Sequence, residues 1–208
     1  MANPAVRRHA LNLPAGSVRA AHVLGIVAMV CAIILIPAPD PENPVAIPPY
    51  LIYLLFLMVG HYFAAHGVTI ATRDDPSPSP LYLPGGVVRV LIILALAGSI
   101  GWKLYSDEPG LIRQYQASLD MLREQLYLPL VILGGFLVGV IIRTIVGRED
   151  PPVAWQDFEA WISVLALVGL GIAAVIHLVQ FTISVPYGMP MWESILGGLV
   201  AFYFGARS

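Results

Sequence analysis

Long apolar stretches, separated by short polar or proline-rich segments, constrain this chain more than any other feature of its sequence. Hydrophobic residues make up 58% of the chain and charged residues only 12%, whereas soluble domains carry about 25% charged residues. Apolar runs of about 20 residues can cross a bilayer as helices, because a helix satisfies its own backbone hydrogen bonds there. The sequence therefore predicts an all-α polytopic membrane bundle, a single integral membrane domain over residues 1–208. Six transmembrane helices are expected, at about 18–37, 50–72, 86–105, 126–146, 158–180 and 191–206.

A further segment, at about 108–125, has a different pattern from the six spans. Its apolar residues recur at spacings of four and three, which places them on one face of a helix. Asp107 is a favourable N-cap, and Pro109 suits a first turn because it has no N–H to leave unpaired. The pattern predicts an amphipathic helix at the outer membrane surface, with its apolar face either on lipid or on a partner protein. The residues of that face are Leu111, Tyr115, Leu119 and Leu122.

The basic residues predict an orientation, because short cytoplasmic loops gather lysine and arginine. With the N-terminus inside, eight basic residues fall on the cytoplasmic side and three on the outer side. We therefore expect both termini to be cytoplasmic. The inner set is Arg7, Arg8, Arg19, Arg73, Arg89, Arg143, Arg148 and Arg207, and the outer set is Lys103, Arg113 and Arg123.

A ten-residue segment occurs twice in the chain. Residues 11–20 (LNLPAGSVRA) and 81–90 (LYLPGGVVRV) share six positions in the pattern LxLPxGxVR. Each copy begins an odd-numbered span on the expected cytoplasmic side, so the repeated parts are parallel. The simplest arrangement is three hairpins facing the same way, made by spans one and two, three and four, and five and six. Many transporters instead contain inverted repeats.

The arginine of each copy, Arg19 or Arg89, falls in the first turn of its span. An arginine at that depth can bind the phosphate of a lipid headgroup with its guanidinium fork. The alternative is that both arginines face a common cytoplasmic vestibule that binds an anion. The sequence therefore predicts that Arg19 and Arg89 bind lipid or another anion.

The first copy and the end of the sixth span resemble a recurrent unit of uncharacterised bacterial multi-pass membrane proteins. In that unit one helix starts with LPxGSVR and another ends with FYFGxRS. Residues 11–20 and 203–208 carry the resemblance here, and the second copy departs from it because Val87 replaces the serine. The resemblance implies a location in the bacterial inner membrane and implies no catalytic activity.

Two histidines, His22 and His61, lie at comparable depth near the cytoplasmic ends of spans one and two. Hairpin partners could bring them together, and paired histidines in a membrane can bind haem or a metal ion. The alternative is that both make ordinary interfacial hydrogen bonds. Only this level of the membrane has more than one histidine, since His177 lies near the opposite face. We expect no cofactor unless these two residues form a haem or metal site.

Small residues recur four positions apart in four of the spans, which lets helix backbones approach closely. They pack helices either within one chain or between copies of the chain in an oligomer. The pairs are Ala97 and Gly101 in span three, and Gly169 and Ala173 in span five. The candidates for packing or oligomer contacts are Gly135 and Gly139 in span four, and Gly197, Ala201 and Gly205 in span six.

No established catalytic motif is present in a suitable context. There is no GxSxG, HExxH or P-loop, and no GxGxxG between a strand and a helix. The formal net charge of −2 gives no support for nucleic-acid binding. We therefore expect a non-enzymatic membrane scaffold or an accessory subunit of a membrane complex. Its partners would be membrane lipids and either copies of itself or other membrane subunits. The alternatives are a small channel or transporter, and a haem- or metal-binding membrane protein.

Overall fold

The chain folds into an all-α bundle, as its sequence predicts. The computed structural model describes residues 17–36, 45–67, 81, 83, 86–146, 152–183 and 190–206, and these contain helices and no strand. The six helices are α1 (Ser17–Leu35), α2 (Pro49–Gly67), α3 (Val87–Glu124), α4 (Leu128–Val146), α5 (Val153–Ile183) and α6 (Pro190–Ala206). Residues 37 and 68–72 of the expected first and second spans lie outside the described residues.

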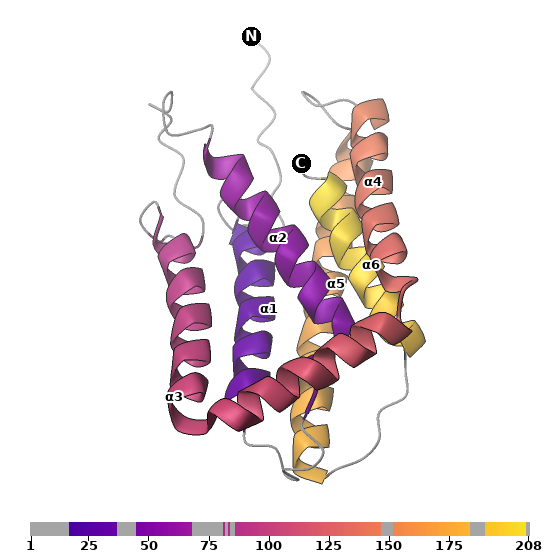
Figure 1. Ribbon diagram of the computed structural model, residues 1–208. Helices are drawn as coiled ribbons and strands as arrows, with labels where there is room; N and C mark the ends of the chain where they lie inside the picture. Colours follow the sequence, from indigo (N-terminus) through magenta and orange to yellow (C-terminus); the bar gives the residue numbers. More distant parts are fainter. Residues whose placement is uncertain are drawn as a thin grey trace.

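Successive helices alternate in direction, so that α1 begins and α6 ends at the same end of the bundle (Figure 1). The first part of α3 stands at one side and α4 at the other, with the remaining helices between them. The second part of α3 then runs across the opposite end of the bundle and leads into α4. We call this second part, residues 108–124, the cross-helix. It corresponds to the amphipathic segment predicted from the sequence.

Asp107 separates the two parts of α3. Its backbone has φ −157° and ψ 64°, which interrupts the helix. The Asp107 carboxylate accepts a hydrogen bond from the Gly110 N–H at 3.1 Å and pairs with Lys103 at 2.9 Å. The hydrogen bond from Lys103, followed by that from Gly110, lowers the pKa of Asp107 below its ordinary value. The residue thus caps the cross-helix and binds the last basic group of the preceding apolar segment.

Four of the described helices are long and apolar enough to cross a membrane: Ser17–Leu35, Val87–Glu124, Leu128–Val146 and Val153–His177. Two shorter apolar helices cover 49–61 and 191–206. Helix α5 carries large apolar side chains along one exposed face, at spacings of three and four. Such a face is unfavourable in water and favourable in lipid, so the structure is that of a membrane protein with transmembrane helices. The exposed residues of α5 are Trp161, Leu165, Val168, Ile172, Val175 and Val179.

The packing partners differ from the expected hairpins at one place. Helix α3 packs mainly on α1, and α4 packs mainly on α6. Spans three and four are therefore not neighbours, because the cross-helix carries the chain from one side of the bundle to the other (Figure 1). The expected pairs α1 with α2 and α5 with α6 are in contact.

Candidate functional site

The two copies of the repeated segment meet at the end of the bundle where α1 and α3 begin. The Leu81 N–H donates to the Ser17 Oγ at 2.8 Å, and this joins the second copy to the first. Gly86 has φ +90° at the N-cap of α3, a conformation that L side chains rarely adopt. The glycine of the pattern is therefore needed for the turn in the second copy. Residues 11–16 of the first copy lie outside the described residues.

Both arginines of the repeat reach the C-terminal half of α2. The Arg89 guanidinium carbon lies 5.7 Å from the centre of the Phe63 ring, within the range of a cation–π contact. Arg19, on α1, is near enough to His61, on α2, for its charge to act on that imidazole. The structure thus places the two predicted anion-binding residues near the same end of α2, and Arg89 lies over an aromatic ring there.

His22 and His61 are brought to the same aromatic residue. The centre of the fully buried Phe204 ring lies 6.2 Å from that of His22 and 5.9 Å from that of His61, edge-on in both cases. Tyr203 lies 5.3 Å from His22, and Phe136 lies 6.2 Å from His61. Aromatic rings of α6 therefore pack on both imidazoles, and a ring of α4 also packs on that of His61.

The hydrogen bonding of His22 fixes which nitrogen could bind a ligand. Its Nδ1 lies 2.8 Å from the Val18 carbonyl oxygen, so this nitrogen carries the proton and Nε2 has a free lone pair. The Nε2 atoms of His22 and His61 are both buried without a hydrogen-bond partner. In the part of the chain that the structure describes, no group of three His, Cys, Asp or Glu side chains could hold a metal ion. The two histidines can therefore supply at most a pair of ligands, in a densely aromatic setting.

The small residues of α4 and α6 lie in contacts within the chain. A Cβ added at Gly139 would overlap the Phe202 carbonyl oxygen, and one at Gly205 would overlap that of Phe136. A Cβ on Gly135 would meet the backbone of Gly198. In α6, Gly197 faces the Ile132 side chain and Ala201 is fully buried. These five positions set the close approach of α6 to its neighbours in the bundle.

At the opposite end of the bundle, a buried polar cluster attaches the cross-helix. The Gln114 side-chain amide donates to the carbonyl oxygens of Ile33 and Val45, both at 2.9 Å. The Ser118 hydroxyl donates to the Gln114 carbonyl at 2.7 Å and accepts from the Ile47 N–H at 2.9 Å. Both side chains are buried. One face of the cross-helix thus lies on protein, namely on the end of α1 and the segment before α2.

Sequence analysis missed this cluster because it assigned the contact face to the apolar residues. Tyr115, expected on that face, is 63% exposed, whereas Gln114 beside it is buried. A signal was nevertheless present in the sequence. The Ile33 carbonyl would normally accept from the N–H four residues later, but residue 37 is proline and has no N–H. This carbonyl therefore needs a donor other than its own helix, and Gln114 supplies it.

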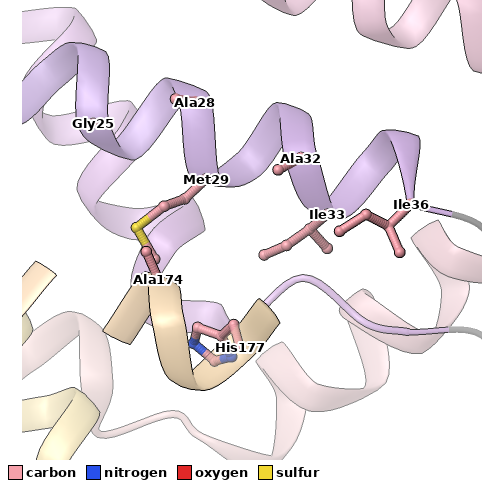
Figure 2. Close-up of a pocket in the computed structure, with 8 residues that line it drawn as sticks. All are labelled: Gly25, Ala28, Met29, Ala32, Ile33, Ile36, Ala174 and His177. Atoms are coloured by element: carbon pink, nitrogen blue, oxygen red, sulfur yellow. The ribbon is translucent and has the colours of Figure 1, made fainter. Parts of the chain in front are cut away.

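A cavity of about 300 Å³ lies between α1 and α5 (Figure 2). It shares Ile33 with the polar cluster. Among the described residues, His177 of α5 is the one polar side chain that lines it. The His177 Nε2 lies 3.1 Å from the Tyr50 hydroxyl at the start of α2. In Figure 2, Ala174 lies beside Met29, and His177 lies farther along α1, toward Ile33. The lining residues are Gly25, Ala28, Met29, Ala32, Ile33, Ile36, Ala174 and His177.

Comparisons with protein-family models, with curated proteins and with solved structures find no match to this chain.

Proposed function

We propose that this chain is a multi-pass protein of the bacterial inner membrane and acts as a non-enzymatic scaffold or accessory subunit of a membrane complex. The observation that carries the proposal is the contrast between the inside and the outside of α4. On the inside, its glycines allow backbone contact with α6. On the outside, Leu130, Leu133, Leu137 and Ile141 form an exposed apolar stripe.

A tightly packed interior of this kind supports a structural role more than a transport role. The charged side chains of the described helices lie within about two turns of a helix end or of the break at Asp107. Ion and proton pathways usually depend on ionisable groups deep within a bundle. The histidines near the start of α1 and the end of α2 lie against aromatic rings. This setting also favours a role in packing over a role in transport.

The charge distribution supports six crossings with both ends inside. Arg19 and Arg89 lie near the starts of α1 and α3, and Arg143 lies near the end of α4. Lys103, in contrast, lies at the far end of the apolar part of α3, and the cross-helix carries the other expected outer residues. Basic residues at one end of the bundle would face the cytoplasm under the positive-inside rule. The cross-helix would then lie at the outer surface.

The stripe on α4 offers a contact for another membrane subunit. A transmembrane helix that shows apolar side chains outward can pack on lipid or on a second helix, because lipid gives no hydrophobic preference for either. In a scaffold, part of this stripe would be covered by protein. The glycines of α6 are not suitable for testing assembly, because replacing them would disturb the contact with α4.

The proposal is tested by native mass spectrometry of the protein released gently from its own membrane. We expect a defined oligomer or a complex with other subunits. Leu133→Trp and Leu137→Trp, in the stripe, should lower the assembled fraction, whereas Leu165→Trp on the exposed face of α5 should leave it unchanged. A monomer without bound protein would contradict the scaffold proposal.

A further inference from the structure

The cavity between α1 and α5 has the length of one leaflet of a bilayer. Its α1 wall runs from Gly25 to Ile36 along one face of the helix. The two residues are eleven positions apart, which at 1.5 Å per residue gives about 16 Å, about half of the roughly 30 Å hydrocarbon core. Since α1 is long and apolar enough to span the membrane, the cavity follows the hydrocarbon of a single leaflet.

The cavity is open toward the outside of the bundle. Ala28 and Ala32, on its α1 wall, are exposed. Their small side chains leave space that a leucine or an aromatic residue would fill. A flexible chain could therefore enter sideways from the bilayer without any change in the helices.

The polar side chain of the cavity lies part-way along its α1 wall, between the levels of Met29 and Ile33 (Figure 2). His177 and its hydrogen-bond partner Tyr50 lie there, close to where Gln114 of the cross-helix binds the Ile33 carbonyl oxygen. The rest of the lining is hydrocarbon or glycine. Ligand sites for amphiphiles have this composition, with a mostly apolar wall and a few polar groups that set the orientation.

We propose that this cavity holds one acyl chain of a phospholipid from the leaflet on the cross-helix side. The acyl chain would lie along α1 toward Gly25, with its ester beside His177 and the headgroup on the cross-helix side. The site depends on the bundle being embedded in a membrane and is independent of the scaffold role.

The test uses the full-length protein reconstituted into vesicles of phosphatidylethanolamine and phosphatidylglycerol in equal amounts. After extraction and exchange into a mild detergent, native mass spectrometry should detect one retained phospholipid per chain. Ala28→Trp and Ala32→Trp fill the cavity and should lower the retained fraction about tenfold, because buried methylene groups provide the binding energy. Ala97→Trp, at an exposed alanine of α3 outside the cavity, should retain the lipid.

Circular dichroism checks that each variant is folded. Should the tryptophan variants fail to fold, Ala174→Leu fills the cavity from the α5 wall by a smaller amount and should also lower lipid retention. Equal lipid retention in the wild type and in folded cavity variants would overturn the proposal, as would a wild type that retains no lipid. It would also be overturned by a dimer, without lipid, that dissociates only in the cavity variants, because the occupant would then be a second copy of the chain.

Discussion

Two glycines on α4, Gly134 and Gly139, differ sharply in what surrounds them. At Gly134 an added Cβ would meet no atom within 4 Å. At Gly139 it would overlap the Phe202 carbonyl oxygen, and the neighbouring atoms belong to the backbone of Gly205 and Ala206. Backbone atoms cannot move aside as the end of a side chain can. The methyl group of an alanine would therefore fit at Gly134 but not at Gly139.

Gly139→Ala should lower the free energy of unfolding by about 1–3 kcal/mol, the usual cost of adding a methyl group to a packed contact. Gly134→Ala should be neutral or stabilising by up to about 1 kcal/mol, because alanine favours helix over glycine. Thermal unfolding in detergent, followed by circular dichroism, measures both. If the two substitutions had equal effects on the free energy of unfolding, α4 and α6 would not be in close contact at Gly139.

The spacing of glycines made this contact partly predictable at the level of residues. Four-residue intervals in α4 and α6 indicated close packing, but the same pattern also allowed a contact between chains. Whether the contact forms within one chain or between chains depends on which helices are neighbours in the bundle. The local sequence of a helix does not contain that information. In the same way, the similar depths of His22 and His61 suggested proximity, but nothing in the sequence indicated that both would pack on Phe204.

Among the elements, the cross-helix is the one whose position depends most on specific hydrogen bonds. The Gln114 amide supplies the hydrogen that the Ile33 carbonyl lacks, and it also binds the Val45 carbonyl. An unsatisfied buried carbonyl costs about 1–3 kcal/mol. The attachment of the cross-helix to α1 should therefore be sensitive to this one side chain.

Gln114→Leu should raise the amide hydrogen exchange of residues 108–124 by roughly 5- to 150-fold, the factor that corresponds to about 1–3 kcal/mol of local stability. Exchange in α4 should change little. Gln116→Leu removes the same type of side chain from an exposed position of the cross-helix and serves as the matched control. If both variants exchanged at the same rate, the hydrogen bonds of Gln114 would not hold the cross-helix in place.

The positions of the helices were predictable because length and hydropathy determine a membrane span. The first span was expected at 18–37 and α1 covers Ser17–Leu35, and the break before the cross-helix was expected near Asp107, where it lies. Contact faces were harder to predict. In α1 and α2 apolar residues surround the helix, so the sequence marks no particular side. In the cross-helix the polar residues Gln114 and Ser118 face protein together with Leu111 of the predicted apolar face.

At the scale of the whole molecule, the cross-helix determines which spans are neighbours. It carries the chain from α3 at one side to α4 at the other (Figure 1). The helices that begin with the two copies of the repeat, α1 and α3, therefore pack side by side, and α4 is left to pair with α6. Charge counting predicted the direction of each span but not this arrangement, because it contains no information about lateral neighbours.

The most direct test of the six-pass arrangement is the labelling of single cysteines with a membrane-impermeant maleimide, in a background with Cys31→Ala. Gln116→Cys places the thiol on the exposed side of the cross-helix, and Ala154→Cys places it at the exposed start of α5, at the other end of the bundle. In spheroplasts we expect Gln116→Cys to react, and Ala154→Cys to react only after lysis. Labelling of both from the same side would contradict the arrangement of the bundle across the membrane. If Ala154→Cys reacted in spheroplasts and Gln116→Cys only after lysis, the orientation of the bundle would be contradicted.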